Sequence, residues 1–148
     1  MNTEHLPFNM PSRSWTLNQN WVNLTFMHWE VDHDLLEKYI PEDLELERYD
    51  GKTYVGTIPF RMEKVRPKYL PSVPFISNFA EFNIRTYVVK NGISGVLFLT
   101  LDAKSRITSM YAPWAYGLPY VYADGDVKDN YEGGFTWKSK RKSNGIGI

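Results

Sequence analysis

The stretch that decides the fold lies in the middle of the chain and reads FAEFNIRTYVVKNGISGVLFLTLD, residues 79–102. Its two halves are rich in β-branched and aromatic side chains, which are typical of strands. Between them, Asn91-Gly92 suits the positive φ angles of a tight hairpin turn. We therefore predict an antiparallel hairpin of Phe79–Lys90 with Ile93–Asp102. Val96–Leu99 lacks polar alternation, so we expect both of its faces to be covered and the hairpin to lie at the centre of a sheet.

Further strands and short helices on both sides of this hairpin complete the predicted sheet. Asn20–Val31 has the composition of a largely buried strand, and Asp32 is positioned to cap a short helix after it. Asp50-Gly51 and Asp124-Gly125 have the same turn chemistry as Asn91-Gly92. Such turns favour antiparallel pairing, because parallel strands need long crossover connections. The predicted fold class is therefore α+β and rich in β structure, an antiparallel meander with a barrel-like form.

Composition and charge limit the classes of function. The 148 residues, 43% of them hydrophobic and 16% aromatic, are sufficient for one folded domain, residues 1–148. Lys plus Arg and Asp plus Glu number 17 each, so neither nucleic acid nor a membrane is predicted as a partner. The absence of cysteine excludes disulfides and thiolate chemistry. We expect a cytoplasmic protein, because neither a signal peptide nor an apolar run of about 20 residues is present. Residues 1–15 and 138–148 are expected to be loose.

No metal or other cofactor is predicted. His5, His28 and His33 do not have the spacing of metal ligands, and no carboxylate cluster completes a ligand set. A phosphate-binding glycine loop and a dinucleotide-binding fingerprint are also absent from the sequence. The expected partner is therefore a small molecule that is held by side chains alone.

The candidate site is the polar series Glu81-x-Asn83-x-Arg85-x-Tyr87. A strand repeats every two residues, so these four side chains share one face, while the apolar residues between them take the other. On the pattern alone, two interpretations stay open. The series is either a solvent-facing ladder with a Glu–Arg ion pair or the polar lining of an internal cavity.

Several motifs resemble those of the YqjF-like group of uncharacterised bacterial proteins, which is related in fold to acetoacetate decarboxylase. The resemblance spans residues 21–123 and rests on His28-Trp29, the Leu-x-x-x-Ile-Pro-x-x-Leu run of Leu36–Leu44, Val55-Gly56, Pro59-Phe60, Arg66-Pro67, Glu81–Val88, Leu101–Ala103 and Leu118–Tyr120. It implies a cone-shaped antiparallel barrel with the face of Glu81 inside. Members of this group are longer, so we expect a barrel that is incomplete at the C-terminus. A homodimer is one way to close its sheet.

The resemblance also bears on the reaction. It implies, for acetoacetate decarboxylase, a catalytic lysine that follows a proline and forms a Schiff base with a keto acid. The matching position in this chain reads Pro119-Tyr120-Val121, without a lysine. We therefore expect no Schiff-base decarboxylation.

Roles within the site follow from side-chain chemistry. Arg85 is the candidate anchor for a substrate carboxylate, and Glu81 is the candidate acid or base. The candidate ligand-binding residues are Asn83, Tyr87, His28 and Tyr120. For His28 a structural role is the alternative, and for Tyr120 it is core packing.

Three functions stay open. We favour a barrel that binds a small carboxylate- or carbonyl-bearing compound without turnover. The others are a lysine-independent enzyme for a small organic acid, and a structural or interaction module whose polar face is only surface.

Overall fold

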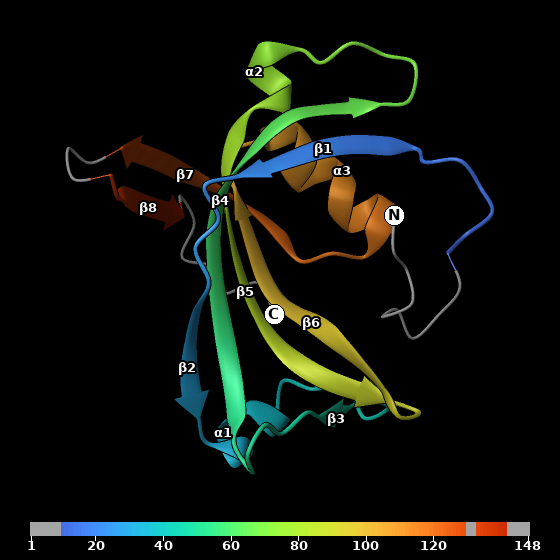
Figure 1. The fold of residues 1–148 in the computed structure, drawn as a ribbon, viewed down its shortest axis with the longest axis vertical. Coiled ribbons are helices and arrows are strands. Elements are labelled where there is room, and N and C mark those ends of the chain that lie inside the picture. Colours follow the sequence, from blue (N-terminus) through green and yellow to red (C-terminus); the bar gives the residue numbers. More distant parts are fainter. Residues whose placement is uncertain (1–9, 130–132, 142–148) are drawn as a thin grey trace.

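Three long antiparallel strands form the centre of the protein. The computed structural model describes residues 10–129 and 133–141, and Figure 1 shows its ribbon. Strand β4 (Thr53–Pro67) pairs with β5 (Phe79–Lys90), which pairs with β6 (Ile93–Ala103). The predicted hairpin of residues 79–102 is confirmed, since Asn91 and Gly92 have φ angles of 52° and 75°. The turn sets the register from Lys90–Ile93 as far as Arg85–Phe98, and an irregularity in the pairing shifts it by one residue beyond that point.

Two short strands lie along β4 on its other side. β1 (Leu17–Val22) and β2 (Met27–Val31) both pair with β4, in succession along its length. The prediction of one buried strand at residues 20–31 is wrong, because the strand is interrupted after β1 at Asn23, which has a φ of 55°. Phe26 and Trp29 are 54% and 50% exposed, as is typical of a sheet edge.

The other side of the sheet is mixed rather than purely antiparallel. Strand β7 (Tyr120–Asp129) runs parallel to β6 over Leu101–Ala103 and pairs antiparallel with β8 (Phe135–Arg141). Helix α3 (Arg106–Tyr116) supplies the crossover that parallel pairing requires. The α+β, strand-rich class is confirmed, with this open mixed sheet of order β1-β4-β5-β6-β7-β8.

Two smaller expectations for the C-terminal part need correction. Asp124-Gly125 does not form a turn, because both residues lie inside β7, where Gly125 passes close to Ala80 of β5. Lys138–Arg141 belongs to β8, so this part of the segment predicted to be loose is paired. Residues 142–148 and 1–9 lie outside the described residues.

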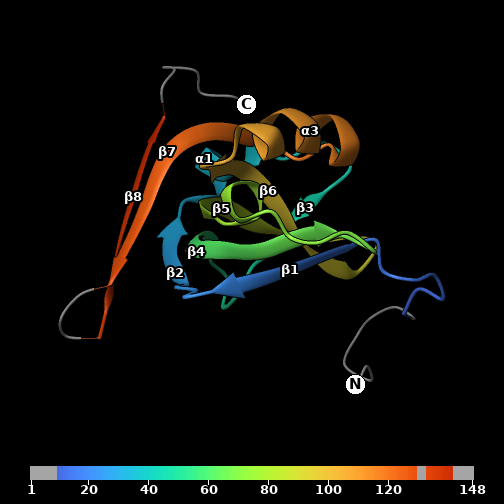
Figure 2. The ribbon, with the colours of Figure 1, turned by 90° about the horizontal axis from the view of Figure 1, so that it is seen from above.

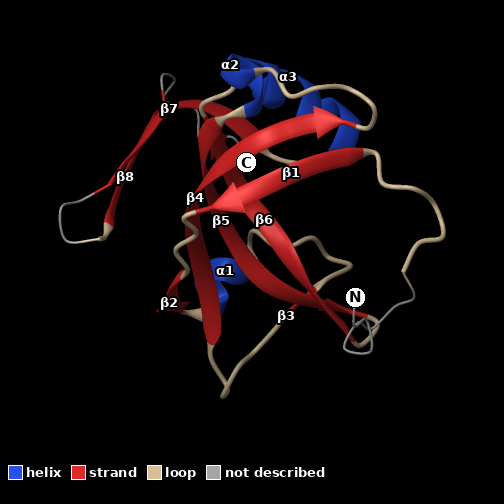
Figure 3. Ribbon diagram, turned by 45° about the horizontal axis from the view of Figure 1, so that its top comes forward, coloured by secondary structure: helices blue, strands red, loops and turns tan. Residues whose placement is uncertain are grey.

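Helices and short elements cover the two ends of the central strands. Figure 3 shows α2 (Pro74–Ser77) and α3 near one end, and α1 (His33–Glu37) near the other, where β3 (Glu45–Leu46) pairs with β5. Figure 2 shows α3 lying across the sheet and the β7–β8 hairpin projecting to one side. None of the helices in the described residues is long and apolar enough to cross a membrane.

The apolar core lies under α2 and α3. It contains Ile58, Phe60, Met62, Phe79 and Ala103, with Tyr120 and Val65 packed against it. The ring of Trp21 stacks on that of Phe60 at 4.4 Å between centroids. Val96 is 43% exposed, so the expectation that both faces of Val96–Leu99 are covered fails at its start, where β7 does not reach β6.

Candidate functional site

Four residue pairings across β4, β5 and β6 define the face that carries the candidate site. Glu81 lies opposite Phe60 and Ala103, and Asn83 lies opposite Ile58 and Leu101. Directly opposite residues share a face of the sheet. Glu81 and Asn83 are 1% and 2% exposed, so this part of the polar series lies inside the protein and is not a solvent-facing ladder.

A cavity of about 640 Å³ lies over this face. The sheet supplies one wall, which includes Trp21, Met62, Phe79, Glu81, Asn83, Phe98, Leu101 and Tyr120. The opposite wall comes from α2, from the loop before it and from α3, with Val73, Ile76, Ile107, Thr108, Tyr111, Ala112 and Tyr116. Leu70, Ile107 and Tyr111 remain 56%, 55% and 53% exposed, which indicates that the cavity opens to solvent between the loop and α3. The lining is therefore mostly apolar, with a few polar groups on the sheet side.

Glu81 is the strongest chemical feature of this cavity. Its Oε1 accepts a hydrogen bond from the Tyr120 hydroxyl at 3.1 Å, and its Oε2 is buried without a hydrogen-bond partner. Burial raises the pKa of Glu81 from its ordinary value of 4.5 to about 7, and the bond from Tyr120 opposes this rise only in part. A buried carboxyl group whose protonation changes near neutral pH is a frequent sign of a functional site.

Two neighbouring polar groups complete the polar part of the cavity. Burial, reinforced by the charge of the Glu81 carboxylate and the hydrogen bond to it, raises the pKa of Tyr120 well above its ordinary value. The phenol therefore stays protonated and remains a donor. Asn83 Oδ1 is buried and lacks a partner, so its amide is also available to a bound molecule.

Arg85, Tyr87 and His28 do not join this group. They lie further along the same face, and Tyr87 and His28 line a second hollow of about 440 Å³ together with Glu47, Arg48, Tyr49 and Tyr54. His28 Nε2 and Tyr87 Oη are 2.5 Å apart, and Arg85 donates to the same oxygen at 3.4 Å. The six predicted residues thus divide into two groups of three.

The apolar wall of the cavity was missed from the sequence, although a signal for it was present. Ile107, Thr108, Tyr111 and Ala112 repeat at the spacing of one helix face. The proline-rich loop at residues 66–71 also contributes to the wall of the cavity. Three of its residues, Pro67, Leu70 and Pro71, line the cavity.

No lysine is found among the described residues that line the cavity. Tyr120 stands directly after Pro119 and uses its hydroxyl to bind Glu81. Lys104, the nearest lysine in sequence to the core strand β6, forms an ion pair with Asp124 at 3.1 Å.

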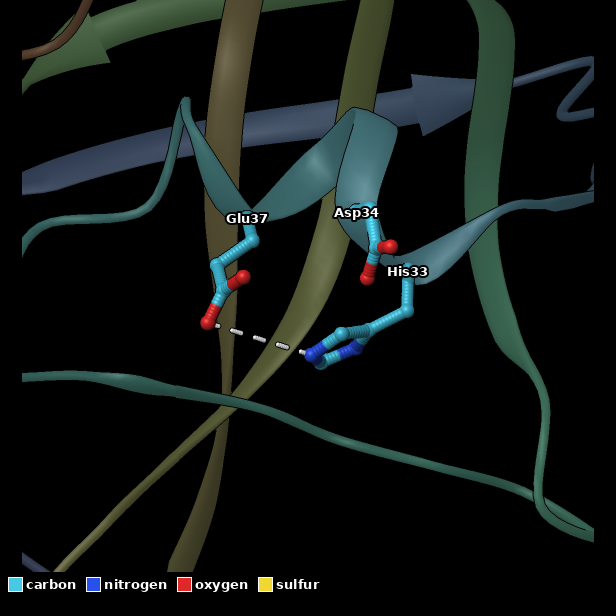
Figure 4. Close-up of side chains that lie close together, drawn as sticks. All are labelled: His33, Asp34 and Glu37. Atoms are coloured by element: carbon cyan, nitrogen blue, oxygen red, sulfur yellow. Dashed lines mark ion pairs between the residues drawn. The ribbon is translucent and has the colours of Figure 1, made fainter.

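One possible ligand set for a metal ion occurs in the described part of the chain. Figure 4 shows His33, Asp34 and Glu37 on α1, whose ligand atoms lie within 4.8 Å of one another. Asp34 and Glu37 are exposed, and His33 Nε2 lies 4.0 Å from Glu37 Oε1. Exposed acidic groups of this kind are common without an ion, so we assign no metal site to them.

Comparison with known proteins identifies the class of fold. Acetoacetate decarboxylase from Legionella pneumophila matches 90% of this chain and 51% of its own, with a TM-score of 0.67 and 19% identity. The enduracididine biosynthesis enzyme MppR, solved with pyruvate, matches 84% of this chain and 46% of its own, with a TM-score of 0.59 and 15% identity. The protein therefore has an acetoacetate-decarboxylase-like fold.

Sequence comparison then identifies the family. The chain belongs to DUF2071, a family of uncharacterized conserved proteins, whose model matches residues 18–147. It is 36% identical over 135 residues to the uncharacterized protein YqjF of Bacillus subtilis (strain 168). This match covers 91% of the chain and 55% of YqjF, so the chain spans about half the length of the relatives it resembles. The predicted YqjF-like relationship is confirmed.

Proposed function

We propose that this protein binds a small, largely apolar compound through its carbonyl or carboxyl group. One observation carries the proposal: Glu81 Oε2 is a buried polar atom without a partner in a cavity whose other walls are mostly apolar. Leaving such a group unsatisfied costs about 1–3 kcal/mol, and a ligand can recover this energy. Apolar cavities with a few convergent polar groups are the usual form of small-molecule sites.

The hydrogen bonds of Glu81 indicate which group the ligand presents. Tyr120 donates to Oε1, so the proton of the neutral carboxyl group belongs on Oε2. Below about pH 7, Oε2 is therefore a free donor, and its natural partner is a carbonyl oxygen or a protonated carboxyl group. Asn83 Oδ1 on the same face can accept a second hydrogen bond, from the hydroxyl of a protonated carboxyl group.

We further propose that this binding does not lead to Schiff-base decarboxylation. The support is the absence of a lysine among the described residues around the cavity, together with the sequence Pro119-Tyr120-Val121. Incubation of the protein with acetoacetate or pyruvate and sodium borohydride, followed by intact mass measurement, tests this. We expect an unchanged mass, and a covalent adduct would contradict the proposal.

An enzyme that uses acid–base chemistry is the second candidate. The pKa of Glu81, about 7, favours it, because a general base or acid works best when its pKa lies near the operating pH. Glu81 in this case removes and returns a proton next to the carbonyl group of the bound compound. A structural module is less well supported, because Glu81 and Asn83 are buried beside a cavity.

Two ligands of the same shape test the binding proposal. At pH 6 we expect 4-phenyl-2-butanone to bind about tenfold more tightly than butylbenzene, because only the ketone accepts a hydrogen bond. Glu81→Leu should abolish this preference, whereas the exposed control Glu30→Gln should keep it. Equal affinities of the two ligands for the wild-type protein would contradict the proposal. Exchange of the ketone α-protons in D2O, measured on the same samples by NMR, would show that the protein is an acid–base enzyme and not a binding protein without turnover.

Partners and location are also proposals. We propose a homodimer, supported by the edge of β6 that faces away from β5, where residues 93–99 have no second strand partner among the described residues. This edge carries no charged residue, and an open apolar edge tends to pair with another strand. Light scattering at micromolar concentration should give twice the chain mass, and a monomeric mass would contradict the proposed homodimer.

The proposal of a cytoplasmic location rests on the sequence and is testable by cell fractionation.

A further inference from the structure

A second polar cluster lies at the far end of the face that carries Glu81. The guanidinium carbon of Arg85 lies 5.5 Å from the ring centres of both Phe26 and Tyr87. The Tyr87 hydroxyl accepts from Arg85 Nη2 at 3.4 Å and pairs with His28 Nε2 at 2.5 Å. Arg85 is thus held between two aromatic rings, which is a favourable setting for a guanidinium group.

A glycine makes this cluster possible. Gly56 lies opposite both His28 and Arg85 on neighbouring strands. A Cβ atom at this position would lie 3.2 Å from His28 Nε2 and 3.3 Å from Tyr87 Oη. The strand therefore leaves open the space in which the histidine and the tyrosine meet.

Arg85 lacks an anion. It is half-buried, its Nε is buried without a hydrogen-bond partner, and no carboxylate of the described residues forms an ion pair with it. Two other half-buried arginines, Arg61 and Arg141, are paired with Glu63 and Asp102. A guanidinium group has five N–H donors, and within the described chain Arg85 uses only one, in a long bond. A partly desolvated cation in this state is complementary to an anionic ligand group.

The cavity borders this cluster, and Arg85 is not itself among its lining residues. Phe98, which lines the cavity, lies directly opposite Arg85 on β6, and Asn83 lies two residues before Arg85 on the same face. Arg85 lies four positions after Glu81 on β5, a distance of about 13 Å between their Cα atoms. One extended ligand can therefore contact both ends of the face.

We propose that Arg85 binds the carboxylate of an elongated amphipathic acid, whose apolar body of about eight to ten carbon atoms lies in the cavity. The proposal rests on the proposed function, because it assigns the apolar body to the same cavity. The guanidinium fork fits a carboxylate and a phosphate equally well. We propose a carboxylate because its single charge is balanced by the one cation Arg85, whereas a phosphate group carries nearly two charges. Tyr87 and His28 are positioning residues, which hold the guanidinium group through the tyrosine hydroxyl.

The Nε–H resonance of Arg85 in a 1H–15N NMR spectrum reports directly on this site. It is assigned by its loss in Arg85→Lys, and the probes are sodium decanoate, decanamide, sodium acetate and inorganic phosphate. We expect decanoate to shift the resonance at a concentration at least about tenfold lower than the concentration that acetate or phosphate requires. Only decanoate combines the negative charge with the apolar body. Decanamide should leave it in place. No shift with decanoate, or an equal response to acetate or phosphate, would overturn the proposal.

Variants separate this inference from the proposed function. Arg85→Met should weaken decanoate binding at least about tenfold and leave the affinity for decanamide unchanged. Arg66→Met is the matched control, because Arg66 also stacks on an aromatic ring, that of Trp15 at 5.6 Å, but lies opposite Asn18 of β1, which does not line the cavity. Tyr87→Phe should weaken decanoate binding less and alter the Nε–H resonance of the free protein.

The two proposals fail in different ways. Unchanged decanoate binding in a folded Arg85→Met protein overturns the anion site while leaving the ketone preference of Glu81 intact. If decanoate shifts the Arg85 resonance but the protein shows no preference for the ketone, only the proposed role of Glu81 is refuted. Circular dichroism of each variant checks its fold. The NMR titration itself uses the wild-type protein, and only the assignment of the Arg85 resonance requires a folded Arg85→Lys variant.

Discussion

The buried carboxyl group of Glu81 predicts a specific dependence of stability on pH. Below about pH 4.5 the group is protonated in both the folded and the unfolded chain, and its burial carries no penalty for charge. As pH rises from 4.5 to about 7, the unfolded chain releases the proton while the folded protein keeps it, so the free energy of unfolding falls. Above about pH 7 the folded protein holds a buried charge, and the penalty is complete.

The size of this penalty follows from the pKa. A rise from 4.5 to about 7 corresponds to roughly 3 kcal/mol, at about 1.4 kcal/mol for each tenfold change in proton affinity. Glu81→Gln has nearly the same shape and removes the titration. Its free energy of unfolding should therefore rise relative to the wild type by roughly 2–3 kcal/mol between pH 5 and pH 8.5. Other titrating groups largely cancel in this difference.

Urea denaturation followed by tryptophan fluorescence, at five values of pH in this range, measures the difference. Glu30→Gln serves as control, because Glu30 pairs with Lys52 at the surface with its side chain 56% exposed. We expect the control to follow the wild type across the range to within about 0.5 kcal/mol. Parallel curves for Glu81→Gln and the wild type would show that the carboxyl group is not desolvated as described, and they would remove the basis for its role as a neutral donor.

Four further substitutions test the packing on which the fold and the site depend. Gly56→Ala should cost about 1–3 kcal/mol in urea denaturation and disturb the His28–Tyr87 pair, seen as a change in the histidine ring resonances, because both side chains must shift away from a methyl group 3.2 Å from His28 Nε2 and 3.3 Å from Tyr87 Oη; wild-type resonances would contradict this. Gly92→Ala should cost about 1–2 kcal/mol because φ is 75°, while Gly95→Ala, with Val88 O at 3.9 Å as its nearest atom, should cost much less. Ser105→Ala removes the side chain that caps α3 at the Thr108 amide and should cost about 1 kcal/mol; retained stability would indicate that the cap is dispensable.

The sequence was most informative where the fold depends on neighbouring residues. The hairpin at residues 79–102 was predictable because Asn91-Gly92 sets the turn, and the turn sets the register of both strands as far as Arg85 and Phe98, beyond which it shifts by one residue. The same dipeptide logic failed at Asp124-Gly125, which lies inside a strand. There the glycine allows β7 to pass close to Ala80. These residues are more than 40 positions apart in sequence, so local turn patterns cannot predict this contact.

Long-range pairing was the part of the fold that local patterns did not encode. The parallel contact of β6 with β7 depends on α3 crossing over the sheet, and Pro113 inside α3 makes this helix hard to predict. The break at Asn23 is of the same kind, because it lets two short strands follow one curved partner, β4. Both features belong to the shape of the whole sheet.

The candidate site shows the same division between what a strand pattern contains and what it omits. A period of two places Glu81, Asn83, Arg85 and Tyr87 on one face, and the pairings across β4 and β6 bear this out. The pattern is silent about what covers that face. Near Glu81 the cover comes from α2 and α3, which are mostly apolar, and the carboxyl group stays neutral below about pH 7. Near Arg85 it comes from Phe26 and His28, and the guanidinium group lies against the rings of Phe26 and Tyr87. One polar series thus acquires an uncharged donor at one end, which suits a carbonyl oxygen, and a cation at the other, which suits a carboxylate.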